Sequence, residues 1–213
     1  MTNFFQVKKK SKLSNARLGL INTSHGKINT PSFIFCGTKA TVKSVLPSQL
    51  KLARTQIILS NTYHLMLQPG PEIISKEGGL QSFTDWNGPM MTDSGGYQIF
   101  SLGYGSVSEE IKGKNNNAKR KSLIKITEDG ASFRNYINGD KVFLSPERSI
   151  ELQRDFGADL IFVLDECTPF NVSKKYTEKS MYMSHRWAAR CKNSFDSKFK
   201  KYNSTFGSSG KQS

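Results

Sequence analysis

Short apolar runs alternate with clusters of polar residues along most of the chain. Gln56–Ser60, Met90–Thr92 and Asp159–Leu164 have the pattern of buried strands, and each ends directly in a polar cluster. Pro31–Phe35 predicts a further strand that ends at Gly37. A strand, a polar cluster and then a helix is the pattern of a parallel βα unit, whose chemistry lies at the carboxyl ends of the strands. We count about four such units.

Helix signals fall between these strands. A short helix is predicted over Ser48–Arg54, which follows a proline suited to the first helical turn, and another helical segment around Glu72–Gly78. Ser145-Pro146-Glu147 opens a helix with a cap, a proline and an acid in the first turn, and Gly157 ends it. A last helix is expected from about Glu178 to Cys191.

Two regions predict antiparallel strands. Arg17–Ile21 and Ile28–Thr30 alternate around a turn and predict a hairpin near the start of the chain. A second region, near residues 112–144, reads as a small β insertion because the βα pattern resumes after it. It begins with a polar, basic stretch, Lys112–Lys125, that we expect to be an exposed loop. Its expected strands are Ser122–Ile126, Ala131–Tyr136 and Asp140–Phe143.

Composition allows one domain of ordinary size, since 213 residues with 36% hydrophobic content can build a core. The net charge of +14 favours an anionic partner, and nucleic acid is the commonest for a soluble protein. The 23 lysines outnumber the 8 arginines, so codon usage can account for part of this excess. The charge is therefore weak support for a nucleic-acid partner.

The cysteine and histidine content argues against a disulfide-rich protein and against a zinc protein. Cys36, Cys167 and Cys191 are odd in number and far apart, which argues against a disulfide framework and for a reducing compartment. Without a CxxC pair, and with three histidines, a zinc site built from this chain is not expected. Met1–Lys10 has its apolar residues before its lysines, the reverse of a secretory signal, and no apolar run approaches membrane-spanning length. We expect a cytoplasmic protein.

The densest chemistry follows the Met90–Thr92 strand. Asp93 stands where a rigid strand gives way to a loop, a common place for catalytic groups. Gly95 and Gly96 let the backbone turn sharply or approach a ligand closely. The alternative is a strand that ends in a turn, with Asp93 and Ser94 capping the next element.

Other polar and aromatic residues extend this candidate site. Tyr97 can stack on a flat ring, and Gln98 offers a donor and an acceptor to its edge. Asp165, at the end of the last strand, forms with Asp93 a pair of strand-end carboxylates that suits acid–base or covalent chemistry on a sugar. The alternative is that each aspartate caps a helix or turn, and Glu166 is either a third member or a solvated neighbour.

Two further residues have open interpretations. His64 is as consistent with packing under the rim as with acting on a substrate. Cys167 can be a small apolar filler, which is the commoner fate of a free cysteine.

Seven motifs occur in a fixed order along the chain. They are Thr30–Phe33, Gly37–Lys43, Ser60–Leu65 with Pro69-Gly70, Thr92–Leu102, Ser145–Ser149, Asp165–Pro169 and Arg186–Cys191. Together they closely resemble the N-terminal half of tRNA-guanine transglycosylase, also called queuine tRNA-ribosyltransferase, of the bacterial type, over about residues 14–213. The resemblance implies an α/β fold: the N-terminal half of a (β/α)₈ TIM barrel within one domain, 1–213, truncated before the zinc-binding region.

The resemblance implies a pentosyltransferase that exchanges guanine at the wobble position of certain tRNAs for queuine or its deazaguanine precursor. Asp93 would be the general acid/base, protonating the departing guanine and deprotonating the incoming base, and Asn61 would hold it in place. Asp165 would accept hydrogen bonds from the purine, Tyr97 would stack on it and Cys167 would line the slot. The rest of the expected base site is Ser94, Gly95, Gly96 and Gln98.

Three stretches of the family are not found in this sequence: a Gly-Ile-Val-Gln-Gly-Gly strand, the nucleophilic aspartate and the zinc cysteines. We therefore expect this chain to hold the general acid/base and part of the base pocket, without the nucleophile and without a cofactor. Expected partners are tRNA with guanine at the wobble position, the purine base and a complementing C-terminal chain; the family's homodimer is left open. The alternatives are an inactive truncated remnant and a non-catalytic tRNA-binding module.

Overall fold

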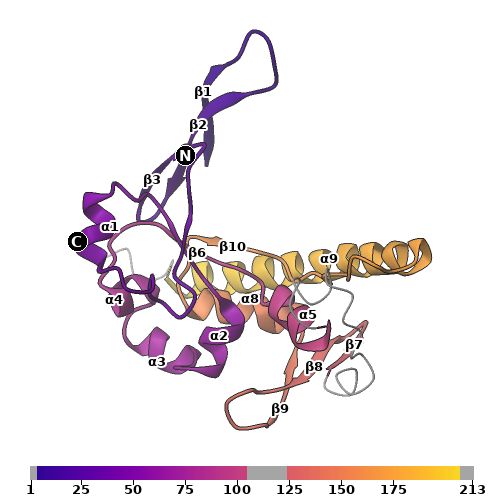
Figure 1. Cartoon of the computed structure of the whole chain (residues 1–213). Coiled ribbons are helices and arrows are strands. Elements are labelled where there is room, and N and C mark those ends of the chain that lie inside the picture. The colour runs from indigo at the N-terminus through magenta and orange to yellow at the C-terminus, as the bar shows by residue number, and fades with distance from the viewer. Residues whose placement is uncertain (1–3, 105–123, 207–213) are drawn as a thin grey trace. The chain divides into compact units, whose positions relative to one another are not determined.

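The computed structural model describes residues 4–104 and 124–206, which form a mixed α/β structure (Figure 1). The chain divides into two compact units. The first unit takes in the chain up to Asp93 together with Gln153–Ile161, and the second takes in Ser94–Leu152 and the chain from Phe162 onward. Asp93 and Ser94 are thus consecutive residues in different units.

A four-stranded parallel sheet forms the centre of the first unit. Its strands stand in chain order: β4 (Phe35–Cys36), β5 (Ile58–Ser60), β6 (Met90–Thr92) and β10 (Leu160–Ile161). Parallel strands that stay in chain order are typical of (β/α)₈ barrels, whereas the order reverses in doubly wound sheets. The register pairs Ser60 with Thr92, so β5 and β6 end side by side.

Four short helices lie between β4 and β6 in the chain. The helix predicted after Pro47 is confirmed, and so is the helical segment around Glu72–Gly78, which is the helix Pro71–Lys76. A separate helix that was not expected, Leu80–Thr84, follows it. The break between these two helices falls at Gly78 and Gly79, whose φ angles of 88° and 95° belong to the left-handed region that ends a right-handed helix. A helix after Asn61 was not expected. The helices are α1 (Pro47–Leu52), α2 (Thr62–Leu67), α3 (Pro71–Lys76) and α4 (Leu80–Thr84).

The N-terminal hairpin is confirmed and belongs to a three-stranded antiparallel sheet, β1 (Phe5–Lys10), β2 (Arg17–Thr23) and β3 (Gly26–Thr30). Strand β1 was not predicted, because three consecutive lysines end it without alternation and its register shifts between Val7 and Lys9. The side chain of Ile28 on β3 is buried in one cluster with Ile57 and Met91 of the parallel sheet region. Hydrophobic burial therefore joins the two sheets of this unit.

Two strands are shorter than predicted. Of the expected strand Pro31–Phe35, only Phe35 pairs with β5, because β5 begins at its partner Ile58. Asp159–Leu164 contributes only β10, and the side chains of Phe162 and Val163 are exposed rather than buried. The reason is that β6, the partner of β10, ends at Thr92, so residues beyond Ile161 have no strand of this sheet to pair with on that side.

The second unit holds α5 (Gly96–Tyr104) and a three-stranded antiparallel sheet where the β insertion was predicted. Its strands are β7 (Ile124–Thr127), β8 (Gly130–Arg134) and β9 (Lys141–Leu144), joined in that order. The helix α8 (Pro146–Asp155) begins where the Ser-Pro-Glu signal predicted, with its last turn belonging to the first unit. Residues 105–123 are not among the described residues. They include most of the expected loop, Lys112–Lys125, and the start of the first expected insertion strand.

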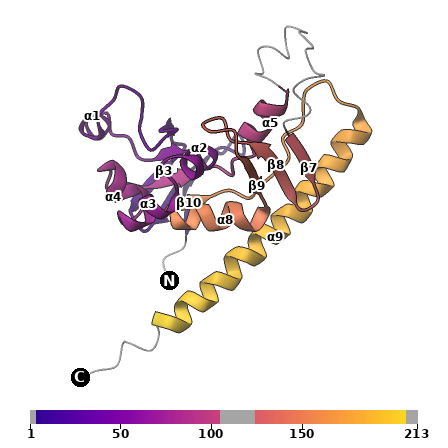
Figure 2. The ribbon, with the colours of Figure 1, turned by 90° about the horizontal axis from the view of Figure 1, so that it is seen from below.

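The helix α9 spans Lys174–Phe206, much longer than the predicted Glu178–Cys191. The sequence from Lys174 to Phe206 contains no glycine or proline, so the helix continues past Cys191 into residues that lack an apolar period. Figure 2 shows α9 running along the β7–β9 sheet, and the Trp187 indole N–H donates to the Glu128 carbonyl oxygen at 2.7 Å. Neither α9 nor any other helix in the described part of the chain is apolar enough over a sufficient length to cross a membrane.

Candidate active site

Asp93 lies at the carboxyl end of β6 and is held by residues at the end of β5. The Asn61 side-chain amide donates to Asp93 Oδ2, and the Thr62 backbone N–H donates to Oδ1 at 2.9 Å. The Thr62 hydroxyl donates to the Asp93 carbonyl oxygen at 2.6 Å, and the Asp93 N–H donates to Ser60 O at 3.2 Å. Both carboxylate oxygens therefore have a fixed protein donor, which holds the group in one orientation.

The orientation of Asn61 is itself determined by its neighbours. Its Oδ1 accepts the His64 backbone N–H at 3.0 Å, which makes Asn61 the N-cap of α2. Its amide nitrogen is thereby directed to Asp93. An asparagine supplies both the acceptor and the donor that this position needs, whereas an aspartate would supply only acceptors.

His64 lies in α2, three residues after Asn61. Its ring meets the Tyr63 ring edge-on with centroids 5.2 Å apart. Burial, and secondarily the positive charge of Lys39, lowers the pKa of the His64 imidazole, so the neutral form is favoured at neutral pH. This geometry is compatible both with packing and with action on a substrate.

In the second unit, two glycines shape the start of α5. Gly95 has a φ angle of 85°, so the chain turns there in a conformation that other residues rarely adopt. A Cβ added at Gly96 would lie 2.7 Å from the Asp165 carbonyl oxygen and 3.0 Å from its Oδ1. The close approach foreseen for this pair of glycines is thus an approach to the Asp165 loop.

Asp165 has few protein hydrogen-bond donors near its carboxylate. The buried Ser94 hydroxyl lies 3.4 Å from Oδ1, a long contact, while Ser94 itself is anchored by the Ser149 hydroxyl, which donates to its carbonyl oxygen at 2.9 Å. Although the residue as a whole is exposed, the surrounding protein raises the pKa of the Asp165 carboxyl, against the smaller opposite effects of a backbone N–H and Ser94. The carboxylate keeps acceptor capacity that a ligand could use.

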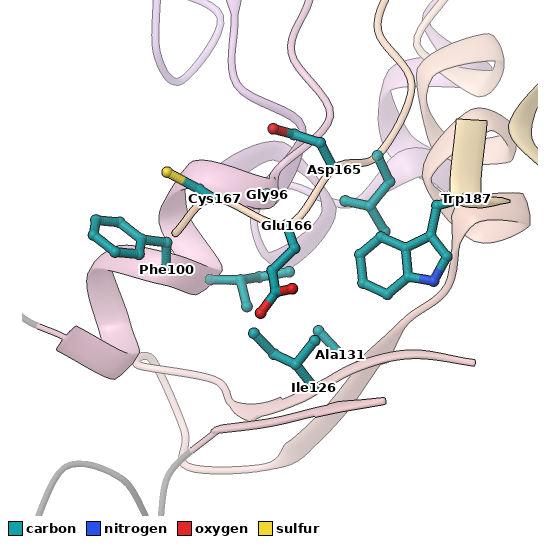
Figure 3. A pocket seen from close by; sticks show the side chains of 10 residues that line it. Gly96, Phe100, Ile126, Ala131, Asp165, Glu166, Cys167 and Trp187 are labelled. Carbon is teal, nitrogen blue, oxygen red and sulfur yellow. The ribbon is translucent and has the colours of Figure 1, made fainter. Parts of the chain in front are cut away.

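A hollow in the second unit lies beneath this loop (Figure 3). Glu166 points into it toward Ile126, whereas the Asp165 carboxylate points away. The Tyr176 hydroxyl donates to Glu166 Oε1 at 2.5 Å, so Glu166 is a partnered residue and not a solvated neighbour. The hollow has room for about one water molecule, so a purine bound to Asp165 would lie outside it.

The remaining expected base-site residues also belong to the second unit. The Tyr97 side chain is 51% exposed, and its ring is tilted against Phe100 with centroids 6.0 Å apart. Cys167 is half-buried at the edge of the hollow. The side-chain oxygen of Gln98 is buried and has no hydrogen-bond partner within the described ranges. Asp93 and Asn61, by contrast, belong to the first unit.

Sequence reasoning missed two residues that the structure connects to these groups. Thr62 holds Asp93 through both its N–H and its hydroxyl, and its only signal was a place in the polar cluster after β5. Tyr176 binds Glu166 from α9, and no local pattern connected the two. Within residues 4–104 and 124–206 no group of three or more His, Cys, Asp or Glu side chains could hold a metal ion.

These features define an α/β protein of the kind that carries its polar functional groups in loops at strand ends. The family model for queuine tRNA-ribosyltransferase matches residues 11–209, and the chain belongs to this family.

Curated relatives with the same name are about equally similar. The protein from Roseiflexus sp. (strain RS-1) is 45% identical over 90% of this chain and 48% of its own length. Those from Protochlamydia amoebophila (strain UWE25) and Staphylococcus aureus (strain JH9) are both 46% identical, over 89% and 86% of this chain and 49% and 44% of their own lengths. The chain therefore spans about half the length of the curated relatives it matches.

Proposed function

We propose that this chain supplies the general acid/base and the purine-recognition residues of a tRNA-guanine transglycosylase, on the N-terminal half of a (β/α)₈ barrel. The names of the relatives support the reaction class, queuine transfer to tRNA. The in-order parallel sheet of the first unit supports the barrel architecture. The observation that carries the proposal is the Asp93 carboxylate, held at a strand end by Asn61 and Thr62.

Asp93 would transfer protons in both halves of the exchange. In its protonated form it gives a proton to the guanine that leaves the ribose, and the resulting carboxylate takes a proton from the incoming base. A positioned carboxylate contributes typically 10²–10⁴-fold to such a step. The donors from Asn61 and Thr62 support this role because they stabilise the carboxylate in the orientation in which it must act.

Asp165 would recognise the purine by accepting hydrogen bonds from N1–H and the exocyclic amine. The long contact from the Ser94 hydroxyl occupies its carboxylate only weakly, which leaves its oxygens accessible to two ligand donors. Tyr97 would stack on the ring from α5, and Cys167 would border the slot. We assign the covalent step on the ribose carbon to a carboxylate outside this chain's residues, in the half of the relatives' length that the chain does not span.

Exchange of radiolabelled guanine into tRNA with guanine at the wobble position tests the proposal. The assay compares this chain alone, and this chain together with the C-terminal half of the Staphylococcus aureus relative. We expect exchange only in the mixture. Exchange by the chain alone would contradict the assignment of the covalent carboxylate, and no exchange from a folded mixture that binds tRNA would contradict the proposed function.

Asp93→Asn in the same mixture tests the central residue. We expect exchange to fall by about 10³-fold or more while tRNA binding is retained, because the amide cannot donate and accept the same proton. The matched control is Asp85→Asn, an exposed aspartate in the left-handed conformation that asparagine tolerates. Normal turnover by Asp93→Asn would remove Asp93 from its role.

A further inference from the structure

The N-terminal third of the chain is entirely free of acidic residues. None of the 17 aspartates and glutamates precedes Glu72, and yet ten lysines and arginines do. This segment therefore holds most of the net charge of +14. The ten are Lys8, Lys9, Lys10, Lys12, Arg17, Lys27, Lys39, Lys43, Lys51 and Arg54.

Three of these residues surround one open hollow at the β1–β2 end of the hairpin. Lys9, Lys10 and Arg17, here called the hairpin cation cluster, line it together with the exposed Pro31 and other small or apolar residues. A regular strand would send Lys9 and Lys10 to opposite faces. The register shift between Val7 and Lys9 disturbs that alternation, as a bulge does when it redirects a side chain.

The pairing within the cluster is electrostatically unfavourable for the isolated protein. Lys10 on β1 stands directly opposite Arg17 on β2, and like charges at such cross-strand positions destabilise a sheet. The Arg17 guanidinium lies 5.9 Å from the centre of the Phe5 ring, which orders it without neutralising it. Across the described residues, no ion pair is formed by any of the three cations.

The cluster is separate from the Asp93 site. Arg17 begins β2, whereas the other end of β2 leads to the turn at His25, whose ring lies 2.9 Å from the buried Asp159 carboxylate. Asp159 in turn accepts the Met90 N–H at 3.0 Å, at the start of β6 and thus at the end opposite Asp93. Figure 1 shows the β1–β2 end of the hairpin extending away from β6.

We propose that the hairpin cation cluster binds the phosphate backbone of tRNA, outside the region that contacts the exchanged base. This inference rests on the proposed function for the identity of the RNA. A nucleic-acid strand presents closely spaced phosphates, and neutralising them releases counterions, which favours binding by clustered cations. Phosphates placed between Lys10 and Arg17 would also relieve the repulsion across the strand pair.

Binding of tRNA by this chain, measured by fluorescence anisotropy over a series of salt concentrations, tests the proposal. The test variant is Lys9→Gln, Lys10→Gln, Arg17→Gln. The control variant, Lys27→Gln, Lys51→Gln, Arg54→Gln, removes the same charges from exposed positions of the same unit. We expect the test variant to bind about tenfold more weakly and to reduce the slope of log Kd against log salt by roughly 2–3, with little change in the control.

Several outcomes would overturn the proposal. Equal losses of tRNA affinity in the two variants would mean that tRNA binds through the overall positive charge of the chain and not through this cluster. An unchanged slope of log Kd against log salt in the test variant would mean that these three cations contact no phosphate. Hairpin-dependent binding to phosphatidylglycerol vesicles, with tRNA binding unchanged, would assign the cluster to a lipid surface. Circular dichroism spectra confirm that each variant is folded.

The transglycosylase function and the hairpin proposal can be tested independently of each other. In the mixture with the C-terminal half, the test variant should raise KM for tRNA and leave kcat unchanged. Hairpin-dependent tRNA binding without any exchange would contradict the transglycosylase proposal alone, whereas exchange with a normal KM for tRNA would contradict the hairpin proposal alone.

Discussion

Asp93 in the first unit and Asp165 in the second are the same residue type, but their surroundings differ in kind. Asp93 directly follows β6, whereas Asp165 lies in a loop, separated from the end of β10 by Phe162–Leu164. Asp93 accepts hydrogen bonds at both carboxylate oxygens from Asn61 and Thr62. Among the described residues, the donors to Asp165 are a backbone N–H and the distant Ser94 hydroxyl, and partial removal of the carboxyl from water raises its pKa. A carboxylate held by protein donors suits repeated proton transfer in one geometry, whereas one with free acceptor capacity suits recognition of a ligand.

The largest effect is expected from removing the Asn61 amide that donates to Asp93 while leaving α2 intact. Asn61→Asp keeps the N-cap oxygen for the His64 N–H but replaces the amide donor with a second carboxylate. Two adjacent carboxylates cannot both ionise easily, so the proton balance of Asp93 changes. In the mixture of this chain with the C-terminal half of the Staphylococcus aureus relative, we expect the rate of guanine exchange to fall about 100-fold with little loss of helix content.

The control for this prediction is Asn87→Asp, which adds the same charge at an exposed position of the first unit. Equal rates for Asn61→Asp and the control would show that the amide donor does not position Asp93.

Removal of the Asp165 carboxylate should affect binding instead of chemistry. Asp165→Ala leaves the two purine donors unpaired, which costs on the order of 1–3 kcal/mol, or roughly 5- to 150-fold in affinity. We expect KM for guanine to rise by that factor with a smaller change in kcat. Asp140→Ala, an exposed aspartate of the same unit, is the control, and unchanged guanine affinity in Asp165→Ala would contradict its assignment.

The smallest expected effects are changes in stability, and they have opposite signs. Asp93→Asn replaces an oxygen that accepts from Asn61 with a group that can donate, so we expect it to destabilise the fold by about 1–2 kcal/mol. Asp165→Asn should raise Tm at pH 7, because burial there disfavours the charged form.

The pH dependence of that difference follows from linkage. The pKa of the Asp165 carboxyl is raised in the folded state, so the folded protein loses free energy of unfolding as this group ionises with rising pH. Below the unfolded-state pKa of about 3.9 the group is protonated in both states and this loss is absent. The Tm advantage of Asp165→Asn should therefore shrink as the pH falls toward 4. Thermal melts of both variants at pH 4 and pH 7 measure it, and a pH-independent difference would contradict the role of Asp165 ionisation.

Local patterns predicted the elements whose signals lie within a few residues. The caps and prolines of α1 and α8, the hairpin β2–β3 and the insertion strands β8 and β9 all depend on neighbouring residues. The ends of strands depend instead on a partner. The apolar run through Leu164 was expected to be one buried strand, but β10 ends at Ile161 because β6 offers no pairing beyond Thr92. The side chains of Phe162 and Val163, which follow β10, are exposed. Likewise α9 continues past Cys191 because nothing in the backbone stops it.

The sequence by itself determined the family, the strand-end position of Asp93 and a turn at Gly95. These depend on residue types in a fixed order. The expectation that Asp165 also stands at a strand end was wrong, because β10 ends at Ile161 and Asp165 lies in the loop beyond it. Only the tertiary structure decided that Thr62 and Asn61 hold Asp93, that Asp165 keeps its acceptors accessible, and that Lys10 stands opposite Arg17. The first and last of these relations arise from strand register, and the second from the path of a loop; neither has a local signal in the sequence.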